Sequence, residues 1–448
     1  MRVRDDSQAP LESIPTAALN QVQKLLDPHQ LTTIQKQLIE HCWIGVTYQE
    51  IATVTGYEDN YVRAVGAQLW QALSQSLDIK VTKSNFRSVV QQHLTAVSSH
   101  PPDALEFPQG QVPLGSKAYI VRGDLESICN ESVTKPGALI RIRAPKQMGK
   151  TSLMARILDF ARQQDYATVT LNLELASTDV LNQNSDFLRW FCVIVGRALR
   201  LPNRLDDYWE PVCGSRSNCT EYFEAYLLPE LSRPLVLALD NIDAVFNYPT
   251  IATELFGMLR AWYESARYGG PESEIWQQLR LVTVYSTEVY IPLDIHQSPF
   301  NVGLPIKLPP FTLEQVQDLV QRHQLNWTIN DIEKLMNLVG GHPYLIRITL
   351  YHAKKQSLSM DEIVETALST AGIYSNHLEK KFWAIQSCPK LLAAMTQLII
   401  ENDISLFTPV TRLKLSGMGL IDIQDNKITV ICNLYRQYFQ VMLSKKNT

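Results

Sequence analysis

Residues 144 to 152 combine glycine, lysine and hydroxyl side chains at a spacing that suits phosphate binding. The sequence there is Ala-Pro-Lys-Gln-Met-Gly-Lys-Thr-Ser. In a phosphate-binding loop, backbone N–H groups wrap the phosphates, the lysine reaches the β- and γ-phosphates, and the next hydroxyl binds Mg²⁺. Lys150 and Thr151 take those two roles. The candidate nucleotide-binding residues are Ala144, Pro145, Lys146, Gln147, Met148, Gly149, Lys150, Thr151 and Ser152.

Ala144 stands where the usual pattern has its first glycine. This is a mild departure, because Ala144 leaves a strand at a turn where alanine can often be fitted. Gly149, which lies close to the phosphate, is retained. We therefore expect a working loop, and a purely structural turn is the alternative.

Asp240 directly follows the apolar run Pro-Leu-Val-Leu-Ala-Leu (234–239). Such a run predicts a central strand that is covered on both faces. An acid at the carboxyl end of that strand lies where ligands bind in open α/β sheets. We expect Asp240 and Thr151 to be the metal-binding residues, holding Mg²⁺ from opposite sides. The alternative is that Asp240 only caps the next helix.

Asn241 occupies the position where many nucleotide hydrolases have a glutamate that polarises water. An amide can orient water but cannot accept its proton. Asp243 could serve instead, and Ser286 and Thr287, which end a strand expected near 280–290, could sense a γ-phosphate or position water. The alternative for these two is a simple turn. Nucleotide binding is therefore better supported than fast hydrolysis, and the candidate catalytic residues are Asp240, Asn241, Asp243 and Thr287.

Two other segments could contact the nucleotide. In Tyr-Ile-Val-Arg-Gly-Asp-Leu-Glu (119–126), the side chains of Tyr119, Val121 or Arg122 could lie beside the adenine. Further along, Gly-Gly-His-Pro-Tyr (340–344) separates two predicted helices, with proline suited to the first turn of the second. His342 and Pro343 would face the nucleotide if these helices form a lid, and a plain inter-helix turn is the alternative.

The elements that must position these residues are predicted from the hydrophobic pattern. Residues 138–143 indicate a strand and 151–164 a helix, on either side of the glycine–lysine turn. From residue 118 to about 310, short β-branched runs alternate with amphipathic stretches, which is typical of a parallel sheet covered by helices. After residue 310 the pattern is helical, and 98–116 has the composition of a linker.

Together these motifs resemble a known family. Four segments carry the resemblance: RAPKQMGKTSL, LALDNIDAVF, YSTEVYIPLDIHQSPFNVGLPIKLPPFTLEQVQDL and LVGGHPYLIR. In this order they look like the bacterial AAA-like ATPase domain, within the signal-transduction ATPases with numerous domains (STAND). The likeness covers about residues 105–445. It implies an α/β P-loop core of the ASCE type, a helical lid and a C-terminal winged helix. It also implies that the Gly-x-Pro turn, here Gly341, His342 and Pro343, contacts the nucleotide.

The C-terminal pattern agrees with that resemblance. Residues 389–440 indicate helix, helix, strand, turn, strand and helix, the order of a winged helix, with a hairpin at 420–431. Winged helices can bind DNA. In STAND proteins they more often pack against the ATPase core and report its nucleotide state, which is the interpretation favoured here.

Residues 48–70 fit a helix-turn-helix, with Ala52 permitting close packing, Gly56 at the turn and Val62 anchoring the second helix. Residues 31–90 contain Lys36, Arg63, Lys80, Lys83 and Arg87 against Glu40, Glu50, Glu58, Asp59 and Asp78, so their charges balance. Without a basic face, the counterion release that drives DNA binding is missing. We expect this module to bind a protein partner, with DNA possible but disfavoured.

Composition sets the remaining limits. The net charge is -4, hydrophobic residues make up 45% and charged residues 19%, which is ordinary globular composition without general attraction to nucleic acid or membranes. Seven cysteines show no metal-ligand spacing. No signal peptide or membrane span is predicted, so we expect a cytoplasmic protein. The predicted domains are 1–30 flexible, 31–97 helix-turn-helix, 98–117 linker, 118–310 ATPase core, 311–374 lid and 375–448 winged helix.

The function expected from the sequence is a switch ATPase in bacterial signalling or conflict response. It would bind ATP or ADP with Mg²⁺, hydrolyse ATP slowly and change conformation or self-associate in response to the nucleotide. Two alternatives remain open. One is an ATP-dependent, DNA-binding transcriptional regulator, and the other is a scaffold that binds nucleotide without turnover.

Overall fold

The computed structural model describes residues 22–23, 31–43, 46–77, 81–83, 86, 89, 106–286, 301–424 and 427–444. The chain divides into two compact units, Met1–Ala104 and Leu105–Thr448. Within the described ranges, no helix is both long enough and apolar enough to cross a membrane.

The N-terminal unit contains the predicted helix-turn-helix. The helices of this unit whose bounds lie in the described ranges are α2 (Thr33–Trp43), α3 (Tyr48–Thr55) and α4 (Asp59–Leu77). Thr47 and Glu50 cap the start of α3 reciprocally, and Gly56 ends it with a φ of 76°. The Gly56 N–H donates to the carbonyl of Ala52 at 2.9 Å. The turn therefore has the geometry that the glycine predicted.

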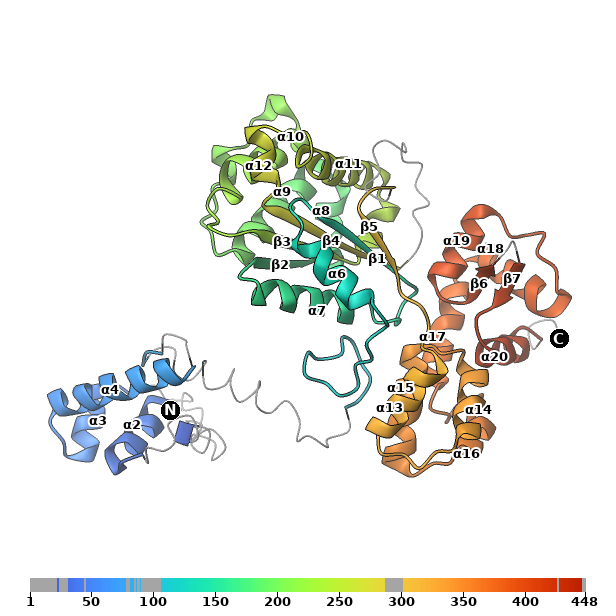
Figure 1. Ribbon diagram of the computed structural model, residues 1–448, viewed down its shortest axis with the longest axis horizontal. Helices are drawn as coiled ribbons and strands as arrows, with labels where there is room; N and C mark the ends of the chain where they lie inside the picture. The colour runs from blue at the N-terminus through green and yellow to red at the C-terminus, as the bar shows by residue number, and fades with distance from the viewer. Residues whose placement is uncertain are drawn as a thin grey trace, which may run out of the picture. The chain divides into compact units, whose positions relative to one another are not determined.

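The larger unit is built on the predicted parallel sheet (Figure 1). Its strand order is β2-β3-β4-β1-β5, and every neighbouring pair is parallel. The strands are β1 (Leu139–Arg143), β2 (Ala167–Asn172), β3 (Leu235–Asp240), β4 (Leu279–Tyr285) and β5 (Leu304–Lys307). All residues of β3 and β4 are buried, as expected for strands with helices on both faces.

Helices cover both faces of this sheet. One face packs on α6 (Leu125–Thr134) and α7 (Lys150–Gln163), which form one hydrophobic cluster with β1, β3 and β4. The opposite face packs mainly on α9 (Asn184–Ala198), α10 (Ser215–Glu221), α11 (Pro249–Ser265) and α12 (Pro271–Trp276). The same unit contains several shorter helices: η1 (Leu173–Leu175), α8 (Thr178–Asn182), η2 (Leu205–Asp207), η3 (Pro211–Cys213), the π-helix η4 (Tyr222–Leu227) and η5 (Ile242–Asn247).

The C-terminal part is helical except for one hairpin. Its first helices are α13 (Leu313–Arg322), α14 (Ile329–Val339), α15 (Pro343–Gln356) and α16 (Met360–Thr366). They are followed by α17 (Ser375–Gln386), α18 (Pro389–Thr396), η7 (Gln397–Glu401), α19 (Pro409–Gly417), β6 (Ile421–Gln424), β7 (Lys427–Val430) and α20 (Asn433–Ser444). The antiparallel β6–β7 pair confirms the predicted hairpin, and the order from α17 onward is that of a winged helix. One hydrophobic cluster joins all these elements.

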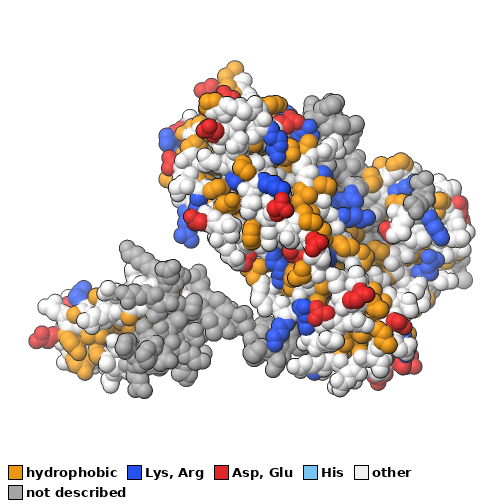
Figure 2. Space-filling view, in the orientation of Figure 1, with side chains coloured by type: hydrophobic (Ala, Val, Ile, Leu, Met, Phe, Trp, Pro, Cys, Tyr) orange, Lys and Arg blue, Asp and Glu red, His pale blue; other side chains and the backbone are white. Residues whose placement is uncertain are grey.

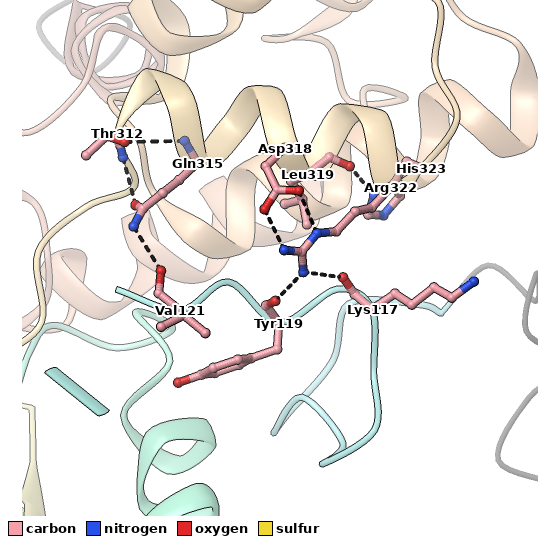
Figure 3. Close-up of polar contacts among 9 residues, drawn as sticks. All are labelled: Lys117, Tyr119, Val121, Thr312, Gln315, Asp318, Leu319, Arg322 and His323. Atoms are coloured by element: carbon pink, nitrogen blue, oxygen red, sulfur yellow. Dashed lines mark hydrogen bonds and ion pairs between the residues drawn. The ribbon is translucent and has the colours of Figure 1, made fainter. Parts of the chain in front are cut away.

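Residues 106–122, which we call the strap, connect the core to the lid helices. Arg322 of α13 donates to the carbonyls of Lys117 and Tyr119 at 3.1 and 2.8 Å (Figure 3). Gln315, about two turns earlier on α13, donates to the carbonyl of Val121 at 3.1 Å. Earlier in the strap, the N–H of Val112 donates to the hydroxyl of Ser152 on α7, at 2.9 Å. The strap therefore touches the helix that follows the phosphate loop as well as the lid.

Candidate nucleotide-binding site

The candidate phosphate loop lies between β1 and α7, as the sequence predicted. Gln147 and Gly149 adopt left-handed conformations with φ of 67° and 96°. Ala144 does not, and its side chain is buried at 2% exposure in the cluster under α7. Glycine is favoured where φ is positive, and Ala144 does not have a positive φ, so the alanine causes no such backbone strain.

Lys150 begins α7, and its ammonium lies back over the loop. Its Nζ donates to the carbonyl of Pro145 at 3.0 Å. Burial lowers the pKa of Lys150 to about 8, against the opposing influence of Asp243 and Asp240. The lysine therefore stands between two carboxylates and the start of the loop, where an incoming anion would stabilise its charged form.

Thr151 and Asp240 meet across the sheet edge. The threonine Oγ1 donates to Oδ2 of Asp240 at 3.1 Å, although the two residues are far apart in the sequence. Burial raises the pKa of Asp240, while hydrogen bonds from the Asn241 N–H and from Thr151 lower it. The described ranges contain no group of three metal-ligating side chains. A Mg²⁺ ion here would take one or two protein oxygens, with phosphate and water completing its octahedron, which is its usual environment.

The side chain of Asn241 points toward β2. Its Nδ2 donates to Oδ1 of Asn172 at 3.1 Å, and its backbone is left-handed with a φ of 53°. Asparagine tolerates this conformation better than most residues, which gives a structural reason for an amide at this position. Asp243 accepts a hydrogen bond from the N–H of Ser286 at 3.2 Å, so it joins the ends of β3 and β4. Thr287 lies outside the described residues.

Arg122 of the strap lies directly against the loop. Its guanidinium donates to the carbonyls of Met148 and Pro309, and a Cβ on Gly149 would lie 3.0 Å from its Nη2. Val121 is 57% exposed. The hydroxyl of Tyr119 donates to Glu126 at 2.6 Å. Of the three residues expected beside the adenine, Arg122 therefore contacts the phosphate loop, through Met148 and Gly149.

The lid turn has a backbone that only glycine fits. Gly340 and Gly341 have φ of 64° and 74°, and a Cβ on Gly341 would lie 2.5 Å from the carbonyl oxygen of Phe311. Pro343 opens α15 at its first turn, as predicted. The ring of His342 is 3% exposed, and neither of its nitrogens has a hydrogen-bond partner. Burial, and then the nearby Lys381 and His377, lower the pKa of His342 well below its ordinary value, so the ring is neutral.

Sequence reasoning missed the contribution of α17. His377 stacks between Tyr344 and Tyr435, and its ring centroid is 6.1 Å from that of His342. Lys381 follows four residues later, so it shares a helix face with His377. That spacing was visible in the sequence, but only the fold shows which surface this face meets.

The comparisons agree with this architecture. An AAA-like domain model matches residues 107–441, about three quarters of the chain. The chain belongs to the AAA-like domain family. Membership implies nucleotide binding. A second model, for the N-terminal helix-turn-helix of vWA-MoxR associated proteins, matches residues 12–93, which confirms the helix-turn-helix in this region.

Several solved structures resemble this chain at low sequence identity. A Walker-type ATPase of Pyrococcus abyssi is 15% identical over 72% of this chain and 96% of that chain, with a TM-score of 0.49. The ORC2 protein of Aeropyrum pernix in its ADP form is 13% identical over 77% and 97%, with a TM-score of 0.39. Cdc6p of Pyrobaculum aerophilum is 13% identical over 72% and 93%, with a TM-score of 0.37. No curated protein matches the sequence.

Proposed function

We propose that this AAA-like protein is a switch ATPase of the STAND type, in which bound ATP or ADP with Mg²⁺ sets the arrangement of core, lid and winged helix. The switch would act in bacterial signalling or conflict response. ATP binding would also favour self-association of the chain. The two residues proposed to hold Mg²⁺ are Thr151 and Asp240, whose 3.1 Å contact supports the assignment.

The observation that carries this proposal is the unpartnered ring of His342. A buried polar group without a hydrogen bond is unfavourable and rare in proteins. His342 is the N-cap residue just before the lid helix α15, and Arg122, which touches the phosphate loop, is among the charges that lower the pKa of His342. A bound nucleotide would supply the missing partner and join the lid to the loop.

Hydrolysis is proposed to be slow. The amide of Asn241 is held by Asn172 and cannot accept a proton from water. Asp243 is engaged by the N–H of Ser286, although a carboxylate can still accept further hydrogen bonds. With no free base at the usual position, the nucleotide would persist long enough to define a state of the molecule.

The N-terminal helix-turn-helix is proposed to bind a protein. Val54, Tyr57 and Tyr61 around its turn are 69%, 42% and 49% exposed, and hydrophobic side chains are visible at this unit's surface in Figure 2. Arg63 is already paired with Asp59 at 2.8 Å, and Lys83 lies over the ring of Tyr48. The exposed apolar residues and engaged cations favour a protein partner over the phosphates of DNA.

Substituting Lys150 tests the nucleotide site. In full-length protein, Lys150→Ala should abolish the rise in melting temperature that ATP and Mg²⁺ give the wild type, because it removes the cation that meets the phosphates. Lys135→Ala, which removes a surface lysine paired with Glu131, is the matched control and should keep the full rise. Equal stabilisation of the Lys150 variant and the control by ATP would refute the site.

A further inference from the structure

Lys381 lies on α17, the first helix of the winged helix, yet its ammonium is close to the phosphate loop of the core. The residue as a whole is half-buried, and its Nζ donates to the carbonyl of Met418. Burial lowers the pKa of Lys381 to about 8, and Lys146 and Lys150 of the phosphate loop add to the effect. Among the described residues, no carboxylate contributes to this pKa. The ammonium therefore lies near two other lysines without an acidic partner.

The contact that brings Lys381 to the loop involves Gly419. This glycine follows α19 with a φ of 68°, and a Cβ built on it would lie 2.9 Å from Cβ of Pro145 and 3.8 Å from Nζ of Lys381. Pro145 of the phosphate loop and Nζ of Lys381 thus both lie next to Gly419. A glycine at position 419 allows the winged helix to approach the loop this closely.

Pro145 also indicates which end of the loop Lys381 meets. The carbonyl of Pro145 accepts the hydrogen bond from Nζ of Lys150 at 3.0 Å. In a phosphate-binding loop, that lysine reaches the β- and γ-phosphates. Lys381 therefore approaches the end of the site where the last phosphates of a nucleotide would lie.

We propose that Lys381 binds the terminal phosphate of a nucleoside triphosphate held at the Lys150 loop. This inference rests on the proposed function and deepens it, because it names the residue by which the winged helix distinguishes a triphosphate from a diphosphate. Lys381, Lys146 and Lys150 carry like charges close together, and Asp240 and Asp243 offset the charge of Lys150 only in part. A polyanion would remove the remaining repulsion. A diphosphate lacks the third phosphate and so leaves Lys381 without an anionic partner.

The test measures the affinities of full-length protein for Mg²⁺ with ADP and with adenylyl imidodiphosphate, a non-hydrolysable ATP analogue, by calorimetry. Lys381→Met should weaken binding of the analogue about 10- to 100-fold, the range for losing a hydrogen bond to a charged group. Its affinity for ADP should change less than about 3-fold, because the interaction is made only with the third phosphate. Lys381→Arg, which keeps the charge, should restore most of the preference for the analogue.

Lys380→Met is the matched control, because it removes an exposed lysine from the same helix. It should leave both affinities unchanged. An equal loss for ADP and the analogue in Lys381→Met, or no loss for either, would overturn the assignment of Lys381. If the wild type binds neither nucleotide, the proposed function itself fails. Should Lys381→Met not fold, Lys381→Gln replaces it, and the ratio of the two affinities remains the deciding quantity.

Discussion

The two helical modules of this chain are of a kind that can bind DNA, yet they use their charged side chains differently. The winged helix directs Lys381 inward, toward the lysines of the phosphate loop. The helix-turn-helix instead exposes Val54, Tyr57 and Tyr61 and pairs Arg63 with its own Asp59. Lys381 and Arg63 therefore do not contribute to a basic surface that could bind DNA. From this difference we infer that the winged helix responds to nucleotide, whereas the helix-turn-helix contacts another protein.

If the winged helix responds to nucleotide, the lid turn must help to bind that nucleotide. We expect the largest loss of affinity when this turn is changed. Replacing both His342 and Pro343 with alanine should weaken nucleotide binding about 10- to 100-fold, because it removes a polar group aimed at a charged ligand and loosens the start of α15. The affinity of the double variant for ATP should be measured by calorimetry beside that of His352→Ala, a control on the same helix.

An unchanged affinity in the double variant would make the turn purely structural. A loss in both variants would point to damage of α15 as a whole. Circular dichroism spectra should match the wild type in each case, since the substitutions leave the core cluster between the sheet and α7 intact.

The rate of ATP hydrolysis distinguishes a switch from a fast hydrolase, and Asn241 is the residue proposed to keep that rate low. Asn241→Glu should raise the ATP turnover rate by about 10-fold or more, because a carboxylate can accept the proton of the attacking water. A longer side chain at a φ of 53° adds strain of about 1 kcal/mol. Asn241→Gln carries the same strain without the base, so it is the matched control. Equal rates for the two variants would place position 241 away from the water.

If the helix-turn-helix binds a protein, the affinity of the chain for DNA should be weak. Full-length protein should bind random-sequence duplex DNA no more tightly than about 100 μM at physiological salt, with a shallow salt dependence, since Arg63 and Lys83 of the helix-turn-helix are already engaged. Fluorescence anisotropy across a salt series measures both quantities. Sub-micromolar affinity with a steep slope would favour the transcriptional regulator over the protein-binding adaptor.

Local motifs let the sequence predict much of the fold and of the candidate site. The loop around Lys150, the strand ending in Asp240 and the glycine turn at position 56 each depend on residues close together in the chain. All three have the predicted secondary structure. Whether Lys150 and Asp240 bind nucleotide and Mg²⁺ stays a prediction.

The remaining features depend on contacts between distant segments. Lys381 meets the loop only because Gly419 packs on Pro145, and Arg122 reaches Met148 only through the path of the strap. The left-handed backbone of Asn241 likewise follows from the turn after β3, and its amide partner, Asn172, comes from a different strand. No periodicity within a single segment encodes these contacts.

The central claim is that the winged helix responds to the third phosphate. Hydrogen–deuterium exchange of α17 (Ser375–Gln386) in full-length protein tests it most directly, because exchange reports local opening of a helix. With Mg²⁺, adenylyl imidodiphosphate should slow exchange in α17 relative to ADP, and Lys381→Met should remove that difference. Identical exchange with the two nucleotides, both bound at saturation, would contradict the claim.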